Sequence, residues 1–292
     1  KAGFSPEVLL ASDYPDLEKV AKTPLGTPQR FFFTQPLVRI KVGGGDVVLN
    51  DTDEYARLGA TSHDENPAIS LSAGKTTRIE PPKGMSNRVS TKFDIDIRPD
   101  GGARIARTVL YEGMEHAEFN KRFTEMLPEK RSRYFQEAVS SISQSAKPVG
   151  KLETDTKAYP GRESMTVDVP NFATIEDGFM LFTLPGAGHF LKSIFQLGSD
   201  KRAGPLYLPD TLDTKIEYTA RLPKEFASVK YMPESFTWEE PGTGGRIKFT
   251  AEHNQKERMV TIRCEVLRKP DVAPASEYGR LLDISERLAH PG

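Results

Sequence analysis

Apolar and polar residues alternate between residues 88 and 111, a pattern typical of strands that bury one face. Phe93, Ile95 and Ile97 alternate with polar neighbours in RVSTKFDIDI, and the turn sequence RPDGG separates this run from ARIARTVLY. Two alternating runs joined by a Gly-Gly turn predict a β-hairpin.

A second hairpin is predicted nearer the start of the chain. FFFTQPLVRIKV (31–42) is rich in β-branched and aromatic residues, and DVVLN (46–50) resumes this pattern after three glycines at 43–45. Glycine supplies the positive-φ positions that tight turns need. Pro36 cannot donate a ladder hydrogen bond, so its strand is expected to have an edge or a bulge there.

The period changes from two to three or four between residues 116 and 143. Phe119, Phe123 and Ile142 belong to this helical pattern, and Pro128 fits the first turn of a second helix.

A C-terminal helix is predicted at 275–288, because one face of it would carry Tyr278, Leu281, Leu282 and Leu288. Further strands are expected at 150–157, 163–169, 177–184, 214–222, 246–251 and 257–268. Many short strands separated by prolines favour an α+β, mostly β fold with sandwich-like regions.

Composition and charge narrow the functional classes. A hydrophobic content of 37% with 16 Phe and 9 Tyr is enough to fill real cores, which argues against intrinsic disorder. The formal net charge of −1 leaves no overall field to attract nucleic acid. FMLFTL (179–184) is the longest apolar stretch and ends at Pro185, far short of a membrane span. No nucleic-acid partner and no transmembrane segment are expected.

The common cofactor motifs fail on spacing. Gly74-Lys75-Thr76 resembles the end of a phosphate loop, but Ile69 stands where that loop needs its first glycine. Counting from Asp51, Asp53 fits position three of a calcium loop, but positions five, six and twelve are Tyr55, Ala56 and Ser62. The five histidines lack the short paired spacing of a zinc site. Neither a cofactor nor a metal is therefore expected.

Two side chains have both a structural and a functional interpretation. Cys264 shares one face of an alternating strand with Val260, Ile262 and Val266, so a core thiol is favoured over a nucleophile. Trp238 and Tyr231 could form a platform for a sugar ring, although packing in a core is the more common role of such aromatic residues.

The first 60 residues resemble part of a known family when they are considered together. The resemblance is to the second half of a bacterial transglutaminase-like core, a relative of papain-type cysteine peptidases. It is carried by three segments: KAGFSPEVLLAS (1–12), FFFTQPLVRIKV (31–42) and GGGDVVLNDTDEYARLG (43–59). RAGPLYLP (202–209), the segment 216–223 and the helix at Tyr278 resemble the β-rich C-terminal region of larger members more diffusely.

The resemblance implies a catalytic triad of which little is retained. Asp51, in LNDT, takes the position of the acid that orients the histidine, and Gln35 stands where the family histidine is expected. Glutamine is no base at neutral pH. The nucleophile helix would precede Lys1, and His63 is a candidate substitute for the missing histidine.

Three functions follow from this reasoning. The first is a non-catalytic accessory region of a transglutaminase-like protein, a pseudoenzyme by itself, that binds a peptide, glycan or protein partner. The second is part of an active cysteine peptidase or amidase whose nucleophile lies upstream of Lys1. The third is a carbohydrate-binding or structural β-protein with peptidoglycan or polysaccharide as ligand. The family resemblance implies a periplasmic or extracellular location.

The same reasoning predicts three regions. Residues 1–62 would form the end of the transglutaminase-like core, and residues 63–200 a β-rich region with the helical insertion at 116–143. Residues 201–292 would form a sandwich-like region that ends in the C-terminal helix.

Overall fold

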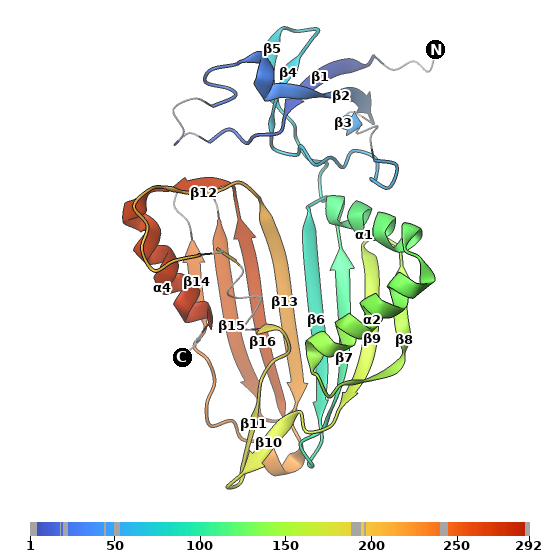
Figure 1. Cartoon of the computed structure of the whole chain (residues 1–292), viewed down its shortest axis with the longest axis vertical. Helices are drawn as coiled ribbons and strands as arrows, with labels where there is room; N and C mark the ends of the chain where they lie inside the picture. The colour runs from blue at the N-terminus through green and yellow to red at the C-terminus, as the bar shows by residue number, and fades with distance from the viewer. Residues whose placement is uncertain are drawn as a thin grey trace.

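The protein consists of two main β-sheets, the smaller of which lies at one end of the larger (Figure 1). The computed structural model describes residues 5–17, 19, 23–43, 45–49, 53–187, 194–195, 197–239 and 245–289. In the described part of the chain no helix combines the length and the apolarity that crossing a bilayer requires.

The N-terminal sheet has five strands in the order β3-β2-β1-β4-β5. Its strands are β1 (Glu7–Ser12), β2 (Phe33–Val42), β3 (Gly45–Leu49), β4 (Pro67–Ser70) and β5 (Lys75–Arg78), preceded at β2 by the short 3-10 helix η1 (Arg30–Phe32). The predicted hairpin is confirmed, because β2 and β3 pair antiparallel with Val42 opposite Gly45. Gly43 has a φ of +58°, which glycine adopts without steric cost.

The large sheet has eight strands in the order β14-β15-β16-β13-β6-β7-β9-β8. Its strands are β6 (Arg88–Ile97), β7 (Ala103–Tyr111), β8 (Lys147–Asp155), β9 (Gly161–Val169), β13 (Leu212–Arg221), β14 (Phe236–Glu239), β15 (Arg246–Asn254) and β16 (Met259–Arg268). The predicted β6–β7 hairpin is present. β13 and β6 pair in parallel, and the other pairs in the described part of this sheet are antiparallel.

The register places the apolar side chains of the large sheet on one face. Phe93 in β6 lies opposite Tyr218 in β13, and the two rings stack with centroids 5.0 Å apart. The residues that precede them in the same strands, Lys92 and Glu217, point to the other face. There Lys92 forms an ion pair with Asp94, and Glu217 forms one with Arg263. One face therefore needs a cover, and the other faces water.

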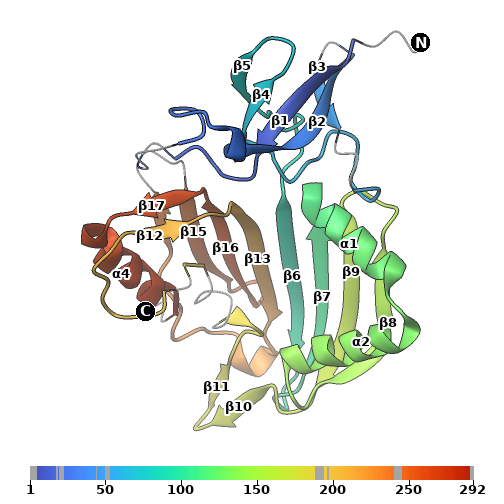
Figure 2. The same ribbon diagram turned by 45° about the horizontal axis from the view of Figure 1, so that its top comes forward.

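Helices provide most of this cover (Figure 2). α1 (Gly113–Glu125) and α2 (Pro128–Ile142) lie over β7, β9 and β8, and α4 (Tyr278–Ala289) lies over β14–β16. Phe119 of α1 is fully buried and stacks on Tyr111 of β7 with centroids 4.5 Å apart. The predicted pair of helices, with the second beginning at Pro128, is confirmed.

Two small sheets complete the covering layer. They are formed by β10 (Ala173–Glu176) with β11 (Phe179–Phe182) and by β12 (Leu206–Leu208) with β17 (Asp271–Ala273). Two further 3-10 helices are η2 (Lys224–Phe226) and η3 (Ala275–Glu277). The expected α+β, mostly β class with a C-terminal helix is confirmed. The layer opposite the large sheet is built from helices and two-stranded ribbons, whereas a sandwich would place a second broad sheet there.

The predicted division at residues 62 and 200 stays a prediction. The large sheet takes β6–β9 from the expected second region and β13–β16 from the third. Polar contacts connect the N-terminal sheet region to the rest of the chain: Lys19 pairs with Asp271 at 2.9 Å, and Lys269 pairs with Glu65 at 2.6 Å.

The helical cover of β7 depends on Phe119, so we expect Phe119→Ala to lower the free energy of unfolding by about 3–5 kcal/mol. The substitution leaves a cavity between α1 and Tyr111, and urea unfolding followed by circular dichroism measures the loss. Leu127→Ala is the matched control, because this side chain between α1 and α2 is exposed and its loss should change stability by no more than ~0.5 kcal/mol. Equal losses in the two variants would contradict this account of the core.

Candidate functional site

The structure describes two of the three side chains that were assigned to the predicted triad, Gln35 and the candidate substitute His63. Asp51 lies outside the described residues. Gln35 lies on β2, and His63 lies in the turn region before β4. The distance between Asp51 and Gln35, on which the triad interpretation depends, therefore stays a prediction.

Gln35 and His63 meet at a carboxylate that the sequence did not single out. Asp13 follows β1 directly, and its Oδ2 accepts hydrogen bonds from Gln35 Nε2 at 3.2 Å and Thr34 Oγ1 at 3.3 Å. Its Oδ1 lies 3.7 Å from His63 Nδ1. An acid beside an imidazole is the arrangement that orients a general base.

The described residues bring no thiol to this pair. Ser12, which precedes Asp13 in the chain, is buried and donates its own proton to the Tyr14 carbonyl at 2.9 Å. The single cysteine, Cys264, lies in β16 of the other sheet and is 2% exposed. Burial raises the pKa of its thiol to about 12, so the reactive thiolate is absent at neutral pH. The predicted role of Cys264 as a core thiol is confirmed.

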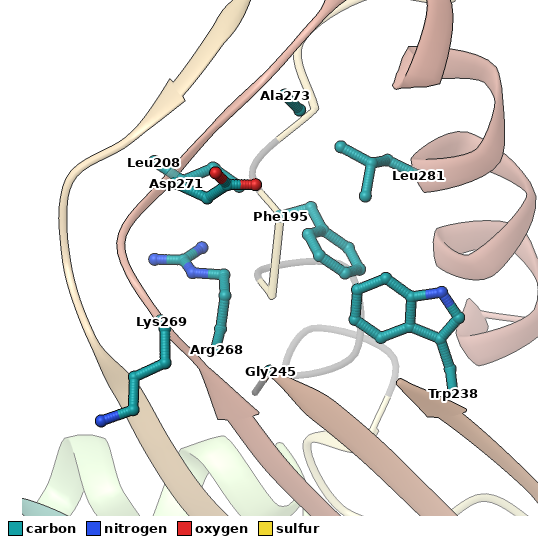
Figure 3. A pocket seen from close by; sticks show the side chains of 9 residues that line it. All are labelled: Phe195, Leu208, Trp238, Gly245, Arg268, Lys269, Asp271, Ala273 and Leu281. Atoms are coloured by element: carbon teal, nitrogen blue, oxygen red, sulfur yellow. The ribbon is translucent and has the colours of Figure 1, made fainter. Parts of the chain in front are cut away.

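Trp238 and Tyr231 lie in different places. Trp238, on β14, packs edge-on against Phe195 at 5.8 Å, close to Leu281 of α4 (Figure 3). The cavity beside it holds about 20 Å³, which is room for about one water molecule. A sugar ring has no space there, and a binding role for Trp238 stays a prediction.

Tyr231 lines a much larger cavity of about 390 Å³. The β11 strand forms one wall and the segment 225–233 forms another, while Tyr218, Ala220 and Ile262 belong to the floor. This volume lies in the range of small-ligand pockets, which are lined mainly by apolar side chains with a few polar groups. The cavity is the best candidate for a functional site in the described part of the chain.

The floor of this cavity is held rigidly. The Tyr218 ring stacks on Phe93, and its hydroxyl donates to the Pro185 carbonyl at 2.8 Å. Burial raises the pKa of Tyr218, so this hydroxyl keeps its proton at neutral pH. The hydroxyl is therefore occupied within the protein, and the charged side chains of the lining, Glu225 and Lys230, are exposed.

The rim of the cavity is apolar and open to water. Phe179 is 52% exposed, Leu181 65% and Tyr231 68%. Large apolar side chains that gather at the mouth of a cavity are typical of binding surfaces. We call the cavity and these three residues the apolar site.

Part of the apolar site had a signal in the sequence. Asp177-Gly178 between apolar residues is a strong hairpin signal, and the structure places both residues at positive φ, between β10 and β11. The predicted strand at 177–184 therefore begins after the turn, at Phe179. No sequence pattern indicated that this hairpin would lie over β13 and β16.

Side chains suited to metal binding do not converge in the described residues: no group of three or more His, Cys, Asp or Glu is placed to hold an ion.

The comparisons with known proteins add one distant likeness. No protein-family model matches the chain, and no curated protein matches it. Among solved structures, the chain is similar to a protein from Parabacteroides distasonis described as a "putative protease", with 13% sequence identity and a TM-score of 0.45. The match covers 99% of this chain and 39% of the Parabacteroides protein.

Asp64, next to His63, should make the stability of the fold depend on pH. Its Oδ1 is buried without a partner, and burial, with a smaller effect of Glu65, raises its pKa from 3.8 to about 7. The folded state therefore binds more protons than the unfolded state between these values, so this group's contribution to stability falls as pH rises from about 4 to 7.

We expect Asp64→Asn to stabilise the protein above pH 7 by about 1–2 kcal/mol, less than the full shift implies because water reaches part of this half-buried residue. The gain should disappear near pH 4. Urea unfolding at pH 4, 6 and 8 measures it, with exposed Asp46→Asn as the control. A gain that is independent of pH would show that Asp64 does not titrate as described.

Proposed function

We propose that this chain is a non-catalytic binding region of a transglutaminase-like, protease-related protein and that the apolar site receives apolar groups of its ligand. The observation that carries the proposal is the cavity of about 390 Å³ with exposed Phe179, Leu181 and Tyr231 at its mouth. The family part of the proposal is supported by the sequence resemblance in residues 1–62.

The energetics favour an apolar ligand group. Complete burial of a leucine-sized side chain contributes about 1.5–3 kcal/mol, and the cavity is already open, so little has to be rearranged before binding. The floor offers few unpaired polar groups, because the Tyr218 hydroxyl donates to the Pro185 carbonyl. A strongly polar group such as a sugar would lose its hydration against this floor without compensation.

Binding of the neutral dye N-phenyl-1-naphthylamine tests this proposal. We expect its fluorescence to rise on addition of the protein, and its affinity to fall at least fivefold in Ala220→Leu, which extends a floor side chain into the cavity, and in Tyr231→Ala, which removes part of the rim.

Tyr207→Ala is the matched control, since this tyrosine is 48% exposed on β12 and does not line the cavity. Thermal unfolding shows that each variant is folded. Dye affinity that is the same in wild type, Ala220→Leu and Tyr231→Ala would overturn the proposal.

A second candidate function is an active cysteine peptidase whose nucleophile lies upstream of Lys1. The 3.7 Å approach of His63 Nδ1 to Asp13 Oδ1 favours it, because this pair could act as the base and its orienting acid. In this candidate Asp13, rather than Asp51, would orient the imidazole.

For this chain alone we expect no hydrolysis of peptide or isopeptide substrates, because the described residues bring no thiol to His63. Release of a fluorophore from a peptide amide measures it. The control is His253→Ala, which changes a histidine on β15 of the other sheet. Turnover that is lost in both His63→Ala and Asp13→Ala, but kept in this control, would contradict the non-catalytic function and favour the second candidate.

A further inference from the structure

The turn fixes the hydrogen-bonding phase of the β10–β11 hairpin, that is, which residues bond each other across the hairpin and which point their backbone groups outward. Its two-residue loop, Asp177 and Gly178, has φ values of 50° and 77°, and Glu176 lies opposite Phe179. In such a hairpin the residues that flank the loop exchange both backbone hydrogen bonds, and the next pair, Ile175 and Met180, points its backbone groups outward.

An independent contact agrees with this phase. Ala173 lies opposite Phe182, two residues beyond Ile175 and Met180, so both should point outward. The Ala173 N–H does donate outward, to the Gly101 carbonyl at 2.7 Å. The outer edge of β10 is thereby tied to the β6–β7 turn.

The outer edge of β11 has no such partner among the described residues. By the same phase, the N–H and C=O groups of Met180 and Phe182 point away from β10. No backbone hydrogen bond joins them to another described segment. Successive outward residues are about 7 Å apart along a strand, so this edge offers two donors and two acceptors in a regular row.

The cavity runs along this edge. Side chains alternate between the two faces of a strand, so Phe179 and Leu181 point to one face and Met180 and Phe182 to the other. All four line the cavity, while no described residue of β10 does. A space in contact with both faces of β11, but not with β10, lies beside the outer edge of β11.

We propose that the ligand of the apolar site is an extended peptide segment that pairs with the outer edge of β11 and places alternate apolar side chains in the cavity. This inference rests on the proposed function. Main-chain hydrogen bonds to an exposed strand, combined with pockets for alternate side chains, are a recurring mode of peptide recognition.

The outer edge of β11, which has no partner among the described residues, distinguishes a peptide from a lipid chain. An acyl chain in the cavity would remove water from the backbone groups of Met180 and Phe182 without replacing its hydrogen bonds, and each buried unsatisfied group costs about 1–3 kcal/mol. A peptide satisfies them with its own amides. The charged lining residues, Glu225 and Lys230, have opposite signs, so we expect no strong preference for charged peptides.

The experiment uses a capped nonapeptide in which leucine and threonine alternate, and follows displacement of N-phenyl-1-naphthylamine. We expect this peptide to displace the dye from the wild-type chain. The same sequence with every internal amide N-methylated should bind at least tenfold more weakly, because it cannot donate to a strand edge.

Two protein variants separate strand pairing from side-chain contact. Met180→Pro removes an outward N–H that the hairpin does not use, and edge strands tolerate proline at such positions. Met180→Ala trims the side chain and keeps the N–H. We expect the peptide to bind Met180→Pro at least tenfold more weakly than Met180→Ala, while both variants bind the dye with similar affinity.

The outcomes distinguish this inference from the proposed function. Dye binding without displacement by the peptide, or equal peptide affinity for the two Met180 variants, would overturn strand pairing and leave the apolar site as a binder of other apolar groups. Displacement of the dye by dodecanoate, but not by the peptide, would identify an acyl chain as the ligand. Failure of the dye itself to bind would overturn both.

Discussion

The large sheet is one-sided, and the rest of the structure depends on this constraint. Its pairing register places Phe93, Tyr218 and Ile247 on the same face as the other apolar residues of the eight strands. Such a face is stable only if another layer removes it from water. α1 and α2 cover one half and α4 the other, so the strip over β13 and the end of β16 is left to a hairpin and the segment 225–233. These thin elements fill the strip incompletely, which explains why the cavity is there.

The opposite face needs no cover because its side chains are charged and mutually paired. Arg88 bonds Asp213 across the parallel pair, and Arg263 reaches both Glu217 and Glu252 across antiparallel pairs. Exposed ion pairs of this kind contribute little to stability, in general about 0–1 kcal/mol each. Their main effect is that they keep the wide sheet surface hydrated. Two molecules would therefore gain little hydrophobic free energy by stacking these faces.

The sequence predicted the elements that local patterns define. The β6–β7 hairpin follows from the alternation around Phe93, and the helix pair follows from the change of period with Pro128 at the start of α2. Most of the observed strands after residue 88 lie within a few residues of the predicted ranges. The broad fold class was accessible for the same reason.

The site was harder to predict from the sequence, because it depends on contacts between residues that are distant in the sequence. The apolar site combines β11 with floor residues from β13 and β16, such as Ala220 and Ile262, and no local pattern records that proximity. Asp13 likewise meets His63 across 50 residues, so a search for spaced motifs could not find it. The sequence reasoning chose Asp51 as the acid through family resemblance, and that choice remains a prediction.

The parallel pairing of β6 with β13 has a consequence for how the chain folds. Arg88 and Asp213, which bond across this junction, are 125 residues apart, whereas β6–β9 and β13–β16 each pair largely with near neighbours in the chain. Long loops are costly to close before other contacts exist, and pairings between distant segments form slowly. We therefore expect each half of the sheet to assemble as its own kinetic unit, with the β6–β13 junction closing last. The floor of the apolar site, where Tyr218 stacks on Phe93, would then be completed only in the final step of folding.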